Sequence, residues 1–139
     1  MKSRSTHLTF VSLVLALGIA GCSTTENRMS STGSEMPTGR FAKETDKSVV
    51  AVINPDGTYT GTTPDGKDWV RGKYTVTGDM VAFADSWTAE AYKDTSCVES
   101  GDGTYRWEAI GSDIKLTLVN DPCSPRAEGI GTSTWKRLR

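Results

Sequence analysis

The stretch GTYRWEAIGSDIKLTL, residues 103–118, carries the clearest structural pattern in this chain of 139 residues. Apolar side chains occupy every second position in both of its halves: Tyr105, Trp107 and Ala109 in the first, and Ile114, Leu116 and Leu118 in the second. Charged or polar residues fill most positions between them. A period of two is typical of a β-strand with one buried face and one face in water. The stretch therefore predicts two strands, 103–110 and 112–119.

Segments of the same kind recur from about residue 39 onward. Each is a short run rich in β-branched and aromatic residues, ended by a Gly or Asp turn. The turns 54–57 (NPDG) and 64–67 (PDGK) indicate hairpins, because Gly accepts the positive φ that such turns require. Neither turn continues into the oxygen-ligand pattern of a calcium loop. The other predicted strands are 40–44, 47–53, 57–63, 69–77, 79–85, 88–94 and 129–138, and no segment shows a sustained helical period.

A weak internal repeat supports a chain of hairpins. Glycine is followed two residues later by tyrosine three times: Gly57 and Tyr59, Gly72 and Tyr74, Gly103 and Tyr105. We expect each glycine to open a new strand. A meander of eight or nine antiparallel strands removes its exposed edges by closing into a barrel. The fold class that we predict is all-β, an antiparallel up-and-down β-barrel of about eight strands; a two-sheet sandwich is the alternative.

The first 38 residues predict export and lipid attachment rather than folded structure. A basic start with Lys2 and Arg4 precedes a mostly apolar run, 8–20, which ends in Ile19-Ala20-Gly21-Cys22. This pattern is typical of a secretory signal, and the four residues resemble a lipobox, so cleavage before Cys22 and lipidation of Cys22 are expected. The run is short for a membrane span, which needs about 20 residues. We predict a signal peptide at 1–21, a lipidated, Ser- and Thr-rich flexible tether at 22–38, and a barrel domain at 39–139.

Cleavage would narrow the possible chemistry. It removes His7, the only histidine, and this excludes catalytic triads that contain histidine and metal sites with histidine ligands. No segment gathers carboxylates at a catalytic spacing, so we expect a protein that is not an enzyme and holds no cofactor or metal. With Cys22 lipidated, Cys97 and Cys123 are the only possible pair, and an oxidising compartment favours a disulfide between them. The chain has 16 basic and 17 acidic residues with the basic ones scattered, which argues against nucleic-acid binding.

The order of several segments resembles small bacterial lipocalin-like domains, within the broader calycin barrels. The segments are Asp56-Gly57-Thr58-Tyr59, Gly72-Lys73-Tyr74-Thr75-Val76-Thr77-Gly78-Asp79, Phe83, Cys97, Gly103-Thr104-Tyr105-Arg106-Trp107, Leu116-Thr117-Leu118-Val119-Asn120-Asp121-Pro122-Cys123 with Arg126, and Trp135-Lys136-Arg137. The resemblance implies a barrel and agrees with a structural disulfide. Lipocalins carry Gly-x-Trp near the first strand and a late arginine that packs over it. Here Gly39-Arg40-Phe41 is the nearest match, with Arg126, Arg137 and Arg139 as candidates for the arginine.

Two functions remain open at this level. An eight-stranded barrel is wide enough either to be filled by side chains or to hold one small ligand. The first hypothesis is an envelope-anchored binding protein for an apolar or amphiphilic small molecule, with five inward-facing ligand-binding residues: Tyr74, Phe83, Tyr105, Trp107 and Leu116. The alternative is a filled barrel that acts as a protein-interaction or inhibitor module through its rim, mainly loop 86–102; its protein partner is unknown.

The residue after the predicted lipidation site bears on location. Ser23 is not the Asp that resembles an inner-membrane retention signal. In a bacterium with two membranes we therefore expect the periplasmic face of the outer membrane, with the membrane contacted through the lipid on Cys22. In a bacterium with one membrane we expect the outer cell surface.

Overall fold

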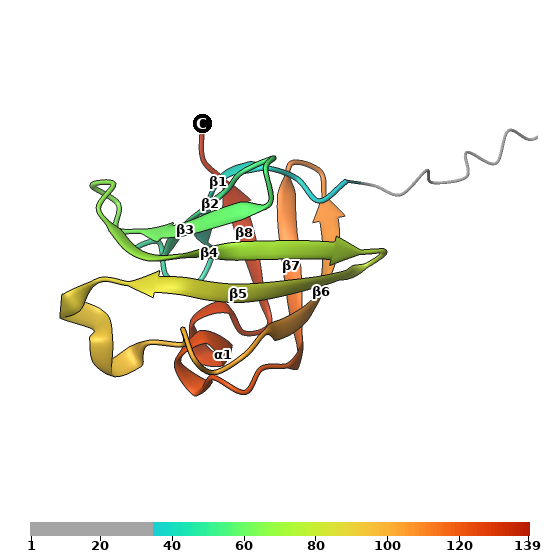
Figure 1. The fold of residues 1–139 in the computed structure, drawn as a ribbon. Coiled ribbons are helices and arrows are strands. Elements are labelled where there is room, and N and C mark those ends of the chain that lie inside the picture. The colour runs from blue at the N-terminus through green and yellow to red at the C-terminus, as the bar shows by residue number, and fades with distance from the viewer. Residues whose placement is uncertain (1–34) are drawn as a thin grey trace, which may run out of the picture. The chain divides into compact units, whose positions relative to one another are not determined.

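Eight antiparallel strands close into a barrel in the computed structural model, which describes residues 35–139 (Figure 1). The strands are β1 (Gly39–Lys43), β2 (Val50–Ile53), β3 (Thr58–Thr62), β4 (Asp68–Thr77), β5 (Met80–Thr88), β6 (Gly103–Ile110), β7 (Asp113–Asn120) and β8 (Ser133–Arg137). Each strand pairs with the next, and β8 returns to β1, where Ala42 lies opposite Lys136. The predicted up-and-down barrel is therefore confirmed over the sandwich. The predicted signal peptide, Cys22 and most of the predicted tether lie outside the described residues.

Two predicted strands are wrong in part. Segment 88–94 is not a strand: β5 ends at Thr88, and a 3-10 helix, Glu90–Thr95, follows. The segment 129–138 begins in a helix, because α1 (Ser124–Ile130) occupies its first two residues and β8 starts only at Ser133. Each helix is about two turns long, too short to produce a sustained helical period in the sequence. Pro125, in the first turn of α1, is a compatible start signal, since that position needs no N–H.

The Gly-x-Tyr repeat marks two strand starts and one interior position. Gly57 directly precedes β3 and Gly103 begins β6, as predicted, but Gly72 lies inside β4, where the pairing with β5 shifts register. A Cβ on Gly72 would collide with the ring of Tyr59 and the carbonyl oxygen of Ala84. This glycine is therefore needed for close approach of the neighbouring strands, not for a turn.

One of the three candidate arginines packs over Phe41. The guanidinium of Arg137 lies 4.9 Å from the centre of the Phe41 ring, a distance suited to a cation–π contact. Gly39 makes room for it, because a Cβ there would lie 2.6 Å from Arg137 Nη1. The contact joins β1 to β8, the two strands whose pairing closes the barrel.

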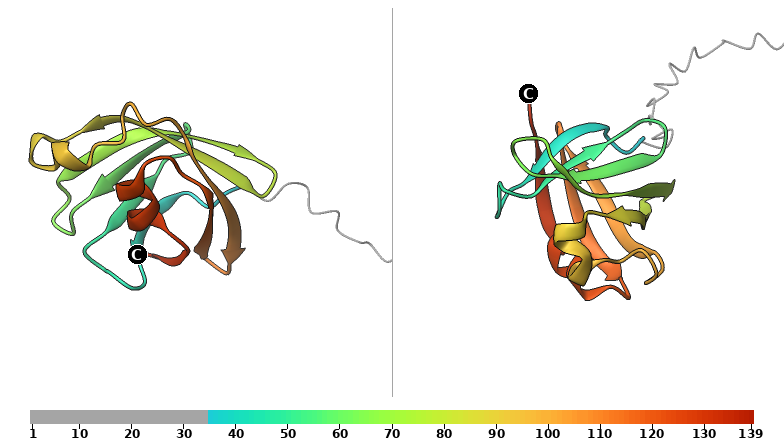
Figure 2. Two further views of the ribbon diagram at one scale, coloured as in Figure 1. Left: turned by 90° about the horizontal axis from the view of Figure 1, so that it is seen from below. Right: turned by 60° about the vertical axis from the view of Figure 1, so that its left-hand side comes forward.

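The two ends of the barrel differ. The turns between β2 and β3, β4 and β5, and β6 and β7 form a closed end, where Tyr74 Oη donates to Asn54 O and Trp107 Nε1 donates to Gly78 O. Met36, within the predicted tether, is buried in the core. The opposite end carries the 3-10 helix and α1, and we call it the mouth (Figures 1 and 2). Within residues 35–139, no helix has the length and apolarity needed to cross a membrane.

Gly72→Ala should lower the free energy of unfolding by about 1–3 kcal/mol, because its methyl group has no space between Tyr59 and Ala84. Gly129→Ala is the matched control: this glycine lies in α1, and a methyl group added to it would meet nothing within 4 Å, so alanine should be neutral or stabilise by up to about 1 kcal/mol. Urea unfolding of both variants measures the difference. Equal effects at the two positions would contradict this account of Gly72.

Candidate binding cavity

A cavity of about 470 Å³ extends from the mouth into the barrel. Sites for small molecules occupy roughly 300–1,000 Å³. Most of the wall is apolar, and its larger side chains include Phe41, Trp69, Phe83, Leu116, Ile130 and Trp135. Ala51 and Gly61 pair across β2 and β3 and both line the cavity, and the missing Cβ of Gly61 makes room for the side chains of Trp69 and Val70. The interior of this barrel is therefore hollow at the mouth.

The cavity wall includes two of the five residues predicted to bind ligand. Phe83 on β5 and Leu116 on β7 line it. Tyr105 is fully buried and packs edge-on against Phe83, with ring centres 5.8 Å apart, but does not line the cavity. Tyr74 and Trp107 hydrogen-bond to turns at the closed end. The alternating pattern identified the inward face, but it did not indicate how far along the barrel the cavity extends.

Several lining residues are absent from the set predicted from the sequence. Tyr59, Trp69, Trp135, Lys43, Asp85 and Arg126 all line the cavity. For two of them the sequence holds a usable signal. Lys43 follows the buried Phe41 by two positions, and Asp85 follows the buried Phe83 by two, so each charged residue shares the inward face of its strand. A charged side chain on a buried face is unusual and indicates either an ion pair or a binding role.

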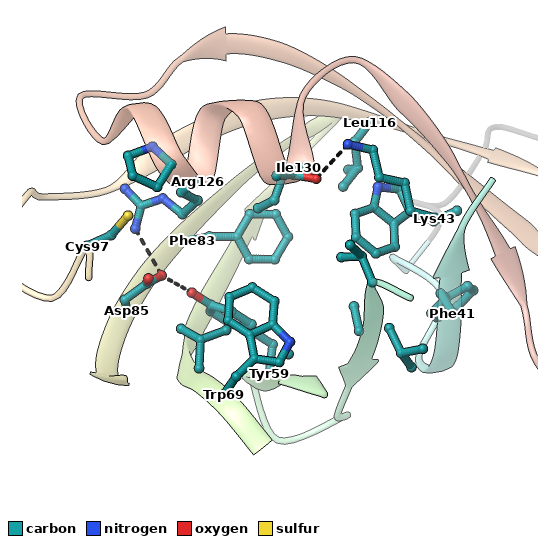
Figure 3. Close-up of a pocket in the computed structure, with 18 of the residues that line it drawn as sticks. Phe41, Lys43, Tyr59, Trp69, Phe83, Asp85, Cys97, Leu116, Arg126 and Ile130 are labelled. Carbon is teal, nitrogen blue, oxygen red and sulfur yellow. Dashed lines mark hydrogen bonds and ion pairs between the residues drawn. The ribbon is translucent and has the colours of Figure 1, made fainter. Parts of the chain in front are cut away.

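Arg126 on α1 lies at the centre of a buried polar network. Its Nε and Nη2 donate to Asp121 at 2.8 and 2.9 Å, and its Nη1 donates to Asp85 Oδ1 at 3.0 Å. A further hydrogen bond, 2.6 Å long, runs from Nη2 to the carbonyl oxygen of Gly101. Tyr59 Oη donates to Asp85, and Tyr105 Oη donates to Asp121 at 2.5 Å. The network joins α1 to β3, β5 and β6, and its Asp85–Arg126 part forms one wall of the cavity (Figure 3).

The shifted pKa values in this network show which of its groups are charged and which are neutral hydrogen-bond donors. Burial opposes ionisation of Asp121, but hydrogen bonds from Arg126 and Tyr105 outweigh it and hold its pKa below the ordinary value. Burial alone would lower the pKa of Arg126, yet its hydrogen bonds to the two aspartates raise it. Burial, with the adjacent carboxylates, raises the pKa of Tyr59 and of Tyr105. Asp121 and Arg126 are therefore charged at neutral pH, and both tyrosines are neutral donors.

A disulfide anchors α1 beside this network. Cys97 and Cys123 are bonded, with their Cα atoms 5.7 Å apart, so the predicted pairing is confirmed. Cys97 follows the 3-10 helix and lines the cavity, whereas Cys123 directly precedes α1. The backbone N–H of Cys123 donates to Asp121 Oδ1 at 2.8 Å. The disulfide therefore joins two segments of the mouth, and the hydrogen bond from Cys123 ties them to the buried carboxylate of Asp121.

The chemistry of the described residues suits binding. Residues 35–139 contain no histidine, and no group of three or more Cys, Asp or Glu side chains among them is placed to hold a metal ion. Asp85 and Asp121 each accept hydrogen bonds from Arg126, and Asp85 also accepts one from Tyr59 and Asp121 one from Tyr105. What faces the cavity is a mostly apolar wall with a few fixed polar groups, the usual composition of a small-molecule site.

The closed barrel of eight antiparallel strands defines the fold as a lipocalin-like barrel, and one solved structure has a similar fold. The chain resembles a lipocalin-like protein from Bacteroides uniformis with 14% identity and a TM-score of 0.50, over 73% of this chain and 97% of that one. An uncharacterized protein from Bacteroides eggerthii gives 12% identity and a TM-score of 0.47, over 74% and 100%. The sequence matches no protein-family profile and no curated protein. At these identities the likeness is one of fold.

Asp121→Asn should lower the free energy of unfolding at neutral pH by about 3–5 kcal/mol, because Arg126 and Tyr105 lose a charged acceptor. The folded pKa of Asp121 lies below the unfolded value of about 3.9, so its carboxylate stabilises the fold above that value. This contribution is lost as pH falls through the folded pKa. The gap between wild type and variant should therefore shrink below about pH 4, as measured by urea unfolding at several pH values.

Asp56→Asn is the control for this pH series. Asp56 lies exposed in the turn before β3 and hydrogen-bonds only the neighbouring Thr58. Its replacement should change the free energy of unfolding at neutral pH far less than Asp121→Asn does, because Asp56 is exposed to solvent. A gap between wild type and the Asp121 variant that stays constant from neutral to acid pH would contradict the role assigned to the Asp121 carboxylate.

Proposed function

We propose that this protein binds an apolar or amphiphilic small molecule inside its barrel. The observation that carries the proposal is the cavity of about 470 Å³, apolar along most of its wall and open at the mouth. Tyr59, Trp69 and Phe83 present aromatic surface to it. Enclosing an apolar ligand against such surface removes both from water, which is the main source of affinity in sites of this kind.

The interior favours this function over the filled-barrel alternative. A filled barrel would act only through its rim, whereas here a cavity of about 470 Å³ lies behind the mouth. Loop 86–102, the predicted contact surface of the alternative, does expose Trp87, Tyr92 and Val98. Arg71 stacks over Trp87 at 4.8 Å and covers part of that surface. The protein-interaction role of this loop stays a prediction.

The lipid anchor belongs to the same proposal. Residues 19–22 support cleavage before Cys22 and lipidation of that cysteine, and Ser23 supports the periplasmic face of the outer membrane in a bacterium with two membranes. Glu35 to Thr38 lie beside Tyr74 and Gly78 at the closed end of the barrel. The described chain therefore enters the barrel at its closed end.

Leu116→Trp should occupy part of the cavity and weaken the binding of a small apolar probe. N-phenyl-1-naphthylamine brightens in apolar surroundings, so titration of the wild-type protein should give a saturable rise in its fluorescence. The variant should weaken binding by about tenfold or more, because the indole occupies space that the probe needs. Leu118→Trp is the matched control: Leu118 lies two residues further along β7, is 38% exposed and does not line the cavity.

Equal binding by these two variants would place the probe elsewhere on the protein and count against the cavity. Near-ultraviolet circular dichroism of both variants shows whether the barrel packing is retained. A wild-type protein that gives no saturable signal with this probe or with unbranched aliphatic alcohols would overturn the proposed function.

Cys22→Ser should abolish lipidation and release the protein from membranes. In cells fed radiolabelled palmitate, the wild-type chain should carry label and sediment with the membrane fraction, whereas the variant should do neither. Cys97→Ser is the control, since Cys97 forms the disulfide and its replacement should leave labelling unchanged. A wild-type chain without label would contradict the anchor while leaving the binding function standing.

A further inference from the structure

Lys43 is a charged residue on the inward face of the barrel. It ends β1, two positions after the buried Phe41, and lies opposite Trp135 in the pairing of β1 with β8. Directly paired residues point to the same face of a sheet. Trp135 is buried, and both residues line the cavity. The Lys43 side chain therefore extends along the wall to the mouth rather than out from the barrel.

The ammonium group of Lys43 has neutral partners only. Its Nζ donates to the carbonyl oxygens of Gly129 and Glu128, at 2.8 and 3.2 Å, near the end of α1. An ammonium has three N–H donors, so one remains. Among residues 35–139, no carboxylate oxygen lies within 4.0 Å of this nitrogen. The lysines that do form ion pairs in this part of the chain, Lys67, Lys93 and Lys136, have exposed side chains. A partly buried positive charge at the cavity wall is therefore left without an ion-pair partner within 4.0 Å.

Two acidic residues lie at the mouth, and one of them, Asp46, has its pKa lowered mainly by hydrogen bonds from Ser48 and to a smaller extent by the charge of Lys43. Asp46 and Glu128 line the rim, where solvent screens their charge. The Oδ1 of Asp46 accepts hydrogen bonds from the N–H and the hydroxyl of Ser48, at 3.0 and 2.6 Å, within its own turn. The backbone carbonyls that Lys43 contacts carry no net charge. Its positive charge thus remains available to a ligand.

The residue opposite Lys43 contributes a second hydrogen-bond donor. The Nε1–H of Trp135, its cross-strand neighbour, is enclosed and has no acceptor within the part of the chain that the structure describes. Lys43 and Trp135 thus place two hydrogen-bond donors on this part of the wall, and no carboxylate in residues 35–139 forms an ion pair with Lys43.

The other polar part of the cavity has the opposite sign. Arg126 is paired with both Asp85 and Asp121, so this group of three carries one more negative than positive charge. Arg126 already makes four hydrogen bonds to protein acceptors. Figure 3 shows Asp85 and Arg126 on one side of the cavity and Lys43 on the other, with Phe83 between them. An anion would be repelled at the first side and attracted at the second.

We propose that the ligand is a monoanionic amphiphile, an alkyl chain ending in a carboxylate that Lys43 binds at the mouth. The carboxylate accepts the remaining N–H of Lys43 and balances its single charge. The alkyl chain lies along Phe41, Leu116 and Phe83, away from Asp85. This inference rests on the proposed function and specifies the class of molecule that the cavity takes.

Three probes with one alkyl chain and different head groups test the inference. Decanoate, decanol and decyltrimethylammonium are titrated into the purified full-length chain, with intrinsic tryptophan fluorescence and calorimetry as readouts. Decanoate should bind about tenfold or more tightly than decanol, since a hydrogen bond to a charged group is stronger than one between neutral groups. Decyltrimethylammonium should bind most weakly.

Variants of Lys43 separate head-group binding from a structural role in holding α1. Lys43→Met should reduce the affinity for decanoate to within about threefold of that for decanol and leave decanol binding unchanged. Lys43→Arg, which keeps the charge, should retain the preference for decanoate. Lys47→Met is the matched control, because Lys47 is exposed in the adjacent turn and does not line the cavity; its preference should equal that of wild type.

The outcomes distinguish the two levels of the proposal. Equal affinities of the wild type for decanoate and decanol, or the tightest binding by decyltrimethylammonium, overturn the head-group assignment and leave a binding cavity. A parallel loss of decanoate and decanol binding in Lys43→Met shows that Lys43 only supports α1, which also overturns the assignment. Absence of binding by all three probes overturns the proposed function and this inference with it.

Discussion

The structure of the mouth depends on one buried cation, the guanidinium of Arg126. A charge taken out of water costs several kcal/mol unless it is paired and hydrogen-bonded. Arg126 meets this requirement with Asp85 on β5, Asp121 after β7 and the carbonyl oxygen of Gly101. Because these partners come from separate parts of the chain, the pairing holds α1 against the barrel and shapes the wall of the cavity.

The interior of the barrel is lined differently at its closed end and toward its mouth. At the closed end, Met36 and Trp107 are buried in the core, and Met36 also forms part of the cavity wall. Toward the mouth, Ala51 and Gly61 stand opposite each other, and aromatic rings surround the remaining space. The charged groups there are divided, with a net negative network on one side and Lys43 on the other. Such a division gives a bound amphiphile a preferred orientation, since its head group and its tail meet different walls.

Much of the fold could be predicted from the sequence because strand formation is a local property. Alternation in 103–119 and the Gly-rich turns located β6, β7 and the hairpins, and counting cysteines identified the bond between Cys97 and Cys123. The 3-10 helix at 90–95 and α1 were missed, since neither is long enough to leave a periodic pattern. Of the predicted ligand-binding residues, Phe83 and Leu116 line the cavity, while Tyr74 and Trp107 lie at the closed end.

The amino-acid order alone predicts an antiparallel barrel and, most clearly for β6 and β7, which face of a strand is buried, because a period of two marks that face residue by residue. The three-dimensional packing adds that the barrel is hollow, that Arg126 joins Asp85 to Asp121, and that Lys43 lies beside Trp135. These features depend on distant contacts, such as that of Lys43 with Gly129, 86 positions away. They also depend on the curvature that closes β8 onto β1, and no local pattern encodes either.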